Sequence, residues 1–464
     1  MKSKFYTYTN RSSNSLRKSV IAISGLASVL ILGSANALLG APLYWDISNG
    51  TGLDAGNGTW STISGDWNTS ASPASQGRDG WANPSEAFFN ASGTSLVTVS
   101  GTVQVNSIAF NGTGYTIAGT TLTLTGVGGN ITVNADAAIS AVLGGTVGLT
   151  KLGAATLTLS GANTYTGLTD VQVGTLALGA SNTFADSSTL KVSGGTLSLV
   201  TNSDTVAAVQ LTGGSITSSS GVLTSTSAYD LQAGSVSAKL GGTGIALNKT
   251  TSGTVTLSGA NTYTGITSIT AGTLVVNGNQ SSATGVVNVA SIAKLFGTGT
   301  IGGETTILGT QSSGASSGAI GTQTFSSSLT YGSGSIFEWD INVTGGTQTH
   351  DRIVANSLLG SGAAFKIVDT GDGYAAAFWN STRNWTATDL FGASNATVNL
   401  ATIFTTTTSF NPSSLEGSFS FTSTGGGTSN QLTWTAVPEP TSALAGILLG
   451  AGLLRRKRTL RQSA

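Results

Sequence analysis

The feature that most constrains this 464-residue chain is an internal repeat that is almost verbatim. The octet SGANTYTG occurs at Ser160–Gly167 and again, 98 residues later, at Ser258–Gly265. The matching segments extend on both sides, over 151–179 and 249–278, and each joins two apolar–polar alternating runs through a Gly-containing connection. A motif that recurs together with its turns is typical of repeat proteins, in which each unit buries its apolar face against the next unit.

Alternating runs of four to eight residues also fill most of the chain from residue 38 to 310, and they predict many short β-strands. Gly makes up 65 of the 464 residues and suits the corners, because it adopts positive φ without strain. We therefore predict an all-β fold: a right-handed parallel β-helix, then a C-terminal β region and a short C-terminal transmembrane-like helix. Asn163 and Asn261 are candidates for amide ladders at the corners. The positions expected to face inward are Leu157, Leu159, Val255 and Leu257.

The repeated unit K-x-G-x-x-T-L-T-L-S-G-x-N-T-Y-T-G-x-T-x-V-x-x-G-T-L resembles the autotransporter-associated β-strand repeat of large secreted bacterial proteins. The second copy has Thr251 where the first has Gly153, and Val255 where the first has Leu157. Neither difference disfavours a strand. The resemblance implies a β-helical passenger protein.

The N-terminus has the order of a secretory signal peptide. Arg11, Arg17 and Lys18 precede an apolar run of fourteen residues, Val20 to Gly33. Ala35 and Ala37 follow in an A-x-A arrangement, so we predict cleavage by signal peptidase after Ala37. A core helix and a membrane anchor are the alternatives, but the run is short for a span, and the order of basic, apolar and small residues is diagnostic of a signal peptide.

The C-terminal tail has a second apolar run, Thr441 to Leu454, of fourteen residues. As a helix it is about 21 Å long, against a hydrocarbon core of about 30 Å. A basic cluster follows directly, and by the positive-inside rule it stays on the cytoplasmic side. This cluster consists of Arg455, Arg456, Lys457 and Arg458.

The order V-P-E-P-T, apolar run and basic end resembles the PEP-CTERM sorting signal. The resemblance implies that Pro438, Glu439 and Pro440 are recognised by an exosortase-type sorting enzyme. It also implies transient anchoring in the inner membrane of a Gram-negative-type bacterium, followed by release to the cell surface or extracellular matrix. A plain tail anchor is the alternative.

These features predict four segments: a signal peptide (1–37), a β-solenoid (38–310), a C-terminal β region (311–436) and a sorting tail (437–464). Gly309–Thr322 is Gly/Ser-rich and is interpreted as a linker. The region beyond it is expected to be either a small β domain or a modified continuation of the solenoid.

Charge and cysteine content exclude several classes. Ten of the 19 basic residues lie in the two ends, which leaves the body between them a formal charge of about −9. Nucleic-acid binding needs a basic face and is not expected. The chain has no cysteine, so disulfides and thiolate metal sites are excluded.

Tryptophans occur only before and after the predicted coils. One group is Trp45, Trp60, Trp67 and Trp81, and the other is Trp339, Trp379, Trp385 and Trp434. The favoured interpretation is that they cover the two open ends of the solenoid. The alternative is that they stack on sugar rings.

Candidate catalytic residues are few. The single histidine, His350, lies in a polar loop sequence without a recognisable triad. Glu338 and Asp340 share one face of a strand at about 7 Å, as a glycosidase pair can, but edge-strand carboxylates are usually just exposed. The run Val368–Tyr374 lacks the spacing of a calcium loop. We therefore predict no catalytic residues, metal or cofactor.

Two functions remain. The first is an exported, non-enzymatic structural or adhesive protein of the cell surface or extracellular matrix. The alternative is a polysaccharide-binding or polysaccharide-active β-helix protein of the matrix.

Overall fold

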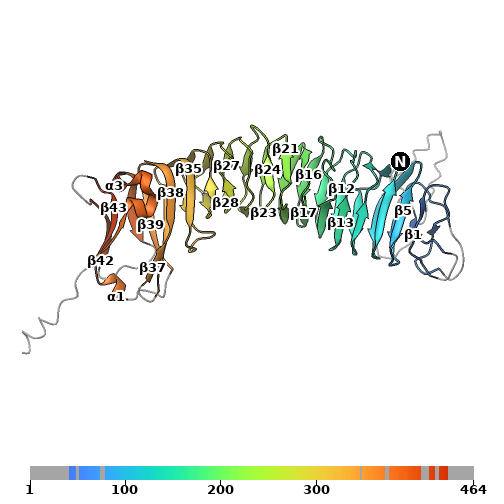
Figure 1. Cartoon of the computed structure of the whole chain (residues 1–464), viewed down its shortest axis with the longest axis horizontal. Coiled ribbons are helices and arrows are strands. Elements are labelled where there is room, and N and C mark those ends of the chain that lie inside the picture. The colour runs from blue at the N-terminus through green and yellow to red at the C-terminus, as the bar shows by residue number, and fades with distance from the viewer. Residues whose placement is uncertain are drawn as a thin grey trace, which may run out of the picture. The chain divides into compact units, whose positions relative to one another are not determined.

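The computed structural model describes residues 41–48, 52–73, 79–344, 347–370, 376–408, 417–423 and 428–436. The chain divides into two units, Met1–Leu38 and Leu39–Ala464, and every described residue belongs to the second. In this unit, parallel strands stack in chain order into a β-solenoid of about 12 turns with very little helix (Figure 1). The predicted parallel β-helix is confirmed.

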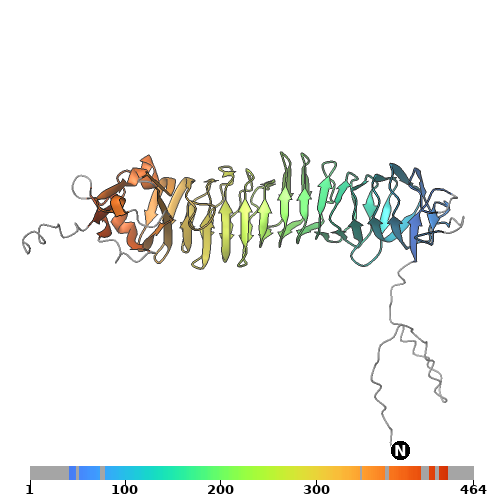
Figure 2. The ribbon, with the colours of Figure 1, turned by 90° about the horizontal axis from the view of Figure 1, so that it is seen from below.

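Two long sheets form the main walls, and they can be followed from a second side in Figure 2. Sheet A consists of β1 (Pro42–Trp45), β3 (Trp67–Asn68), β4 (Ser85–Phe89), β6 (Val103–Phe110), β8 (Leu122–Leu124), β9 (Asn130–Val133), β11 (Leu143–Gly144), β12 (Leu149–Leu152), β14 (Thr169–Val171), β16 (Thr189–Val192), β19 (Ala208–Leu211), β22 (Tyr229–Leu231), β25 (Leu247–Lys249), β27 (Thr267–Ile269), β29 (Asn279–Gln280), β30 (Val287–Val289), β32 (Thr300–Ile301), β33 (Thr305–Ile307), β35 (Thr322–Tyr331) and β38 (Arg352–Gly360).

Sheet B consists of β2 (Gly58–Trp60), β5 (Ser95–Val99), β7 (Tyr115–Gly119), β10 (Ala137–Ile139), β13 (Thr156–Leu159), β15 (Thr175–Leu178), β17 (Thr196–Ser198), β20 (Ser215–Thr217), β23 (Gly234–Val236), β26 (Thr254–Leu257), β28 (Gly272–Val276), β31 (Ala293–Phe296), β34 (Thr310–Ser312), β36 (Ile336–Thr344), β37 (Thr347–His350), β39 (Ala363–Asp369) and β41 (Phe404–Thr408). Along the chain, strands of the two sheets mostly follow one another in turn, but some coils place two consecutive strands in sheet A, such as β8 and β9 or β32 and β33.

Two three-stranded sheets and four short helices complete the described part. Sheet C is β18 (Asp204–Val206), β21 (Val222–Ser225) and β24 (Lys239–Gly241), and sheet D is β40 (Arg383–Thr386), β42 (Gly417–Thr422) and β43 (Gln431–Ala436). The helices are α1 (Ala376–Trp379), α2 (Ala387–Phe391), η1 (Ala393–Asn395) and α3 (Leu400–Ile403). Among the described residues, none of these helices has the length and apolar character needed to cross a membrane. The predicted C-terminal helix lies outside the described residues.

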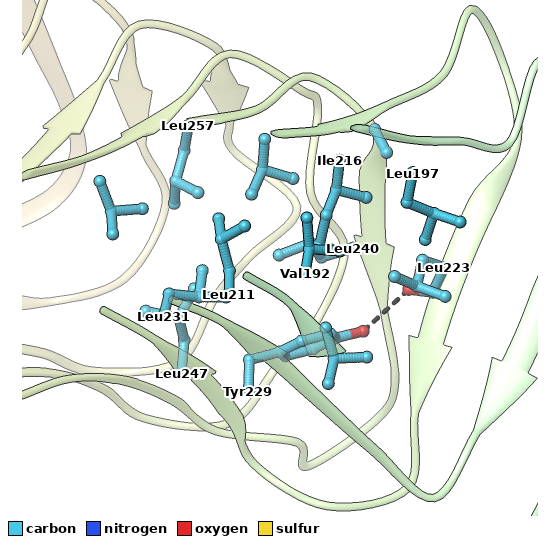
Figure 3. Close-up of a cluster of buried hydrophobic side chains, with 14 of the residues drawn as sticks. Val192, Leu197, Leu211, Ile216, Leu223, Tyr229, Leu231, Leu240, Leu247 and Leu257 are labelled. Atoms are coloured by element: carbon cyan, nitrogen blue, oxygen red, sulfur yellow. Dashed lines mark hydrogen bonds between the residues drawn. The ribbon is translucent and has the colours of Figure 1, made fainter. Parts of the chain in front are cut away.

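The core is an inward column of aliphatic residues on each wall. In sheet B, Leu157 pairs in register with Leu176, and Leu176 pairs with Leu197. The four positions expected to face inward in the two repeat copies are at most 1% exposed. Each such buried side chain contributes about 1.5–3 kcal/mol relative to an exposed one. Figure 3 shows this core at mid-stack, where Tyr229 donates its hydroxyl to the carbonyl of Leu223 at 2.8 Å.

The octet SGANTYTG forms a corner that contains no strand. Its Asn side chain accepts the hydrogen bond that a strand backbone would accept at this place. Asn163 Oδ1 accepts a hydrogen bond from the backbone N–H of Leu143 in the preceding coil, at 2.8 Å. Asn261 Oδ1 accepts from the N–H of Leu240, also at 2.8 Å. The expected amide ladder at these two positions is therefore wrong, because each side chain bonds to backbone instead. An amide ladder does occur elsewhere, through Asn90, Asn111 and Asn134.

The Gly/Ser-rich stretch Gly309–Thr322 is not a linker. It contains β34, which pairs in parallel with β31 before it and β36 after it. Ser312 and Ser313 are fully buried. The strand ladder thus continues past residue 310, which favours a modified continuation of the solenoid over a separate domain.

Both ends of the stack contain clusters of buried aromatic rings. At the N-terminal end, the Trp67 ring lies 4.8 Å from the Trp81 ring and 5.0 Å from the Trp60 ring, between ring centroids. At the C-terminal end, Trp379 and Trp434 lie 5.2 Å apart, and the Trp434 indole donates to the Trp379 carbonyl. These contacts bury the edges that the first and last coils would otherwise expose.

Candidate functional site

The predicted export and sorting residues lie outside the described part of the chain. These are Ala35 and Ala37 at the signal-peptide cleavage site, Pro438, Glu439 and Pro440 of the sorting motif, and Arg455, Arg456, Lys457 and Arg458 of the basic cluster. Their roles remain predictions.

The carboxyl groups that the sequence placed on an exposed strand are in fact covered. Glu338 and Asp340 share the outer face of β36, as expected, but they are 5% and 0% exposed. Residues 313–321, which we call the covering loop, fold over this face. The Gly318 N–H donates to Asp340 Oδ2 at 3.1 Å, and Ser317 donates its hydroxyl to Glu338 Oε1. The expectation that these two carboxyl groups lie on the surface is wrong. The alternating pattern of β36 carries no information about the covering loop that packs on its outer face.

Asp340 lies beside a second buried carboxyl group, Asp351. The two residues are close across the antiparallel pair β36–β37, where Asp351 N–H donates to the Asp340 carbonyl at 2.8 Å. A single hydroxyl, Ser312 Oγ, lies 3.4 Å from Asp340 Oδ2 and 3.3 Å from Asp351 Oδ2. It carries one proton and can donate to only one of them. Ionising both carboxyl groups would place two like charges in a poorly solvated space.

The pKa values follow from this arrangement. Burial raises the pKa of Asp340 to about 7, and the charges of Asp351 and Glu338 add to the effect. Burial also raises the pKa of Asp351 to about 6, against the lowering effect of hydrogen bonds from Gly321 and the Asp340 backbone. One carboxyl group of the pair therefore holds a proton near neutral pH.

Glu338 behaves in the opposite way. Burial alone would raise its pKa, but hydrogen bonds from Ser317 and Lys366 and the charges of Lys366 and Lys294 lower it overall. Lys366 Nζ lies 2.9 Å from Glu338 Oε2. Glu338 is therefore ionised and paired, and the cluster fastens the covering loop to β36 and β39.

His350 does not complete a catalytic group in this cluster. Its Nδ1 lies 2.8 Å from the carbonyl oxygen of Asp351, and its ring lies 5.4 Å from the Trp339 ring. In the described part of the chain, no three His, Cys, Asp or Glu residues are grouped so as to hold a metal ion. Asp372 of the run Val368–Tyr374 lies outside that part.

The alternative role for the tryptophans, as sugar platforms, is wrong for all eight. Each is at most 2% exposed, so no ring face is available to a ligand. The favoured interpretation, that they cover the ends of the solenoid, agrees with their contacts.

Sequence reasoning missed the first residue of each repeat copy, Lys151 and Lys249. Both are fully buried in the inward column of sheet A, where Lys151 pairs with Val171 and Lys249 with Ile269. Lys151 Nζ donates to the carbonyls of Leu152, Gly153 and Val173 at 2.8–3.1 Å. Burial lowers the pKa of Lys151 to about 8 and also lowers that of Lys249. The recurrence of Lys at the first position of both repeat copies could have indicated that this side chain has a structural role.

Comparison with known proteins supports the repeats. A family described as Passenger-associated-transport-repeat matches residues 149–178, 173–199 and 247–276. The first and third matches overlap the two predicted copies, and the second is a copy that the sequence analysis missed. No solved structure matches the chain.

One curated relative is the adhesin BmaC autotransporter of Brucella suis biovar 1 (strain 1330). It is 34% identical to this chain over 263 residues, which cover 53% of this chain and 7% of the relative. The chain thus spans a small fraction of that protein's length. The similarity therefore extends over about half of this chain and a short part of a protein named as an adhesin.

Proposed function

We propose that this chain is an exported, non-enzymatic protein of the cell surface or extracellular matrix, whose solenoid provides a structural or adhesive surface. The observation that carries the proposal is the uninterrupted parallel stack with passenger-associated repeats. Similarity to a protein named as an adhesin supports the adhesive role.

The buried carboxyl groups support a non-enzymatic role. Asp340 and Asp351 are fully buried, and Glu338 is paired with Lys366, so none of them reaches a substrate on the surface. An enzyme assay on matrix polysaccharides tests this point. Hydrolysis that is lost in Glu338→Gln would contradict the proposal.

The route to the surface follows the sequence signals. Signal peptidase removes residues 1–37, and the basic cluster holds the tail in the inner membrane for a time. An exosortase-type enzyme then acts at Pro438–Glu439–Pro440, and the mature protein reaches the surface or matrix. This route is supported by the order of the PEP motif, the apolar run and the basic end along the tail, and by the resemblance of the tail to a sorting signal.

Mass spectrometry of the protein released from cells tests the route. We expect a mature N-terminus at Leu38 and no peptide from Arg455–Ala464. Released protein that still carries Arg455–Ala464 would refute the sorting proposal. A Glu439→Ala variant should accumulate in the membrane fraction, whereas Glu304→Ala, a charged position in the solenoid, should be released as usual.

The adhesive role has its own test. Cells that lack the protein should aggregate or attach less than the parent, and the wild-type gene should restore the effect. Unchanged aggregation and attachment would argue against adhesion, whatever the sorting route.

A further inference from the structure

One outer face of the solenoid differs chemically from the other. On sheet A, the outward residues of β14, β16, β19, β22 and β25 are in register: Asp170 pairs with Lys191, Lys191 with Gln210, Gln210 with Asp230, and Asp230 with Asn248. Two residues further along, Gln172, Ser193 and Gln232 follow in the β14, β16 and β22 rows, whereas Thr212 and Thr250 occupy this position in the β19 and β25 rows. The column positions Asp170, Lys191, Gln210, Asp230 and Asn248 are taken together with Gln172, Ser193 and Gln232. We call these eight residues the polar grid. Its rows are about 4.8 Å apart, the spacing of neighbouring strands.

Side chains of the polar grid are ordered by bonds among themselves. Asp170 accepts from Gln172 Nε2 at 3.1 Å and from Ser193 Oγ at 2.7 Å. Asp230 accepts from the amide groups of Gln210 and Gln232, each at 2.8 Å. Lys191 Nζ lies 3.9 Å from Asp170 Oδ2. Groups held in place before binding lose less conformational entropy when a ligand arrives.

The same bonds leave hydrogen-bonding capacity at the surface. Gln172 is exposed, and Gln210 and Gln232 are half-buried. Each of the three uses its amide nitrogen within the grid, and its amide oxygen remains an acceptor with a second N–H as donor. The three glutamines, in the β14, β19 and β22 rows, therefore present hydrogen-bond donors and acceptors on the same face of the solenoid.

Sheet B provides a contrast in the same coils. Its outward column there consists of hydroxyl residues in register, Thr156 with Thr175 and Thr175 with Thr196, followed by Ser215 and Ser235. No amide or carboxylate side chain occupies these five positions. At these register positions, amide and carboxylate side chains thus occur on the outer face of sheet A and not on that of sheet B.

The column continues along sheet A to a shallow hollow. Asn248 pairs with Ser268, and Ser268 pairs with Asn288. The hollow is lined by Ser268, Thr270, Asn288, Ala290, Thr306 and Leu308, among other residues. A ligand that lies along the stack thus meets Asn288 and Thr306 beyond the grid, together with apolar side chains such as Leu308.

Charge and composition narrow the class of ligand. The grid holds two carboxylates and one ammonium group, and the body around it carries about −9, so a polyanion is repelled. Protein interfaces depend mainly on Trp, Tyr and Arg anchors, and none of the eight grid residues is of these types. The amide groups, which can both donate and accept, favour a neutral ligand rich in hydroxyl groups. A polymer can contact several rows at once and gain affinity through multivalency.

We propose that the polar grid of sheet A binds a neutral polysaccharide whose chain runs along the solenoid. The inference rests on the proposed function and supplies a partner class for the adhesive surface. The amide groups of Gln172, Gln210 and Gln232 donate to and accept from sugar hydroxyl groups, while Asp170 and Asp230 hold those amides in position.

Affinity electrophoresis of the full chain tests the proposal, with dextran, mannan, laminarin or galactan in the gel and alginate as an acidic probe. We expect at least one neutral polysaccharide to retard the wild-type protein. The triple variant Gln172→Ala, Gln210→Ala, Gln232→Ala should bind at least tenfold more weakly. The matched variant on sheet B, Thr156→Ala, Thr175→Ala, Thr196→Ala, should bind as the wild type does.

Each other outcome overturns the proposal: no retardation by any neutral probe, retardation by alginate alone, or equal loss in both triple variants. Unfolding midpoints check that the variants fold, and Gln172→Ala alone, at an exposed position, serves if the triple variant does not. Loss of cell adhesion is measured separately. A protein that promotes adhesion but binds no neutral glycan refutes the grid and leaves the proposed function intact.

Discussion

At the residue scale, the Asn261 side chain accepts a backbone hydrogen bond that a neighbouring strand would otherwise accept. The octet corner has no strand, so the N–H of Leu240 has the Asn261 side chain as its acceptor at 2.8 Å. Asn163 does the same for Leu143 one repeat copy earlier. A buried N–H without an acceptor is costly, which explains why the same residue stands at the same octet position in both copies.

Asn261→Ala should therefore destabilise the protein. It leaves the buried Leu240 N–H without a partner, at a cost of about 1–3 kcal/mol. The Asn261 Nδ2 group is itself buried without a partner, so its removal offsets part of this loss. We expect urea unfolding to show a loss of about 1–2 kcal/mol. Asn288→Ala, at an exposed position, is the control and should change stability by less than about 0.5 kcal/mol. Equal effects of the two substitutions would contradict this role.

At the element scale, the aromatic cluster of the first coils should be needed to hold the N-terminal end of the stack. Trp60 ends β2, is fully buried, and contacts the rings of Trp67 and Trp81. Trp60→Ala opens a cavity that costs about 3–5 kcal/mol. Hydrogen exchange should rise in β2 and β5, which pair in register. Ile63→Ala, three residues away and 94% exposed, should leave exchange unchanged.

The two carboxyl groups buried under the covering loop should make the stability of the protein depend on pH. The folded-state pKa values of Asp340 and Asp351, about 7 and about 6, lie above the value near 3.9 expected in the unfolded chain. The folded protein thus binds more protons than the unfolded one between about pH 4 and pH 7, and its stability falls as pH rises through that interval.

Unfolding in urea at pH 5 and pH 8 measures this dependence. We expect the wild type to lose more than about 1 kcal/mol between the two values, because one pKa unit corresponds to about 1.4 kcal/mol. Asp340→Asn should remove most of the loss attributed to this pair. Asp204→Asn, at a second buried carboxyl group whose pKa burial raises to about 6, should leave the Asp340 contribution in place. A pH dependence that Asp340→Asn leaves unaltered would show that the pair is not its source.

The sequence predicted those features that depend on a local pattern of residues along one strand. Alternation at 157 and 159 placed the leucines inside, because a strand with one buried face needs that pattern. Composition misled at 309–322, where Gly and Ser suggested a linker although Ser312 and Ser313 are buried. The burial of Asp340 depends on the covering loop, which arrives through packing between segments about 20 residues apart. Alternation carries no information on such packing, nor on the contacts of Lys151 with three carbonyls.

At the scale of the whole molecule, stability is a sum over neighbouring coils. β28, for example, pairs with β26 of the preceding coil and β31 of the next. In such stacks, energy is transmitted mainly between adjacent repeats. A destabilising substitution in the middle of the stack should therefore affect the neighbouring coils and leave distant coils folded.

Gly272 offers a test of this locality. It begins β28 with a φ of +68°, and an added Cβ would lie 2.4 Å from the carbonyl oxygens of Gly253 and Thr251. Gly272→Ala thus combines a backbone strain of about 1–2 kcal/mol with overpacking of about 1–3 kcal/mol. Gly244 is the matched control, because its φ is +73° but an added Cβ would meet nothing within 4 Å. Gly244→Ala should show the backbone strain alone.

Hydrogen exchange of the two variants then measures how far the damage spreads. In Gly272→Ala we expect amide protection to fall in β26 and β31, the two strands that pair with β28. In β5 and β7, many coils away, protection should match that of Gly244→Ala. A uniform loss that reached β5 and β7 would mean that the stack unfolds as one cooperative unit. In that case the nearest-neighbour description fails for this solenoid, because the energy of one corner would be shared by every coil.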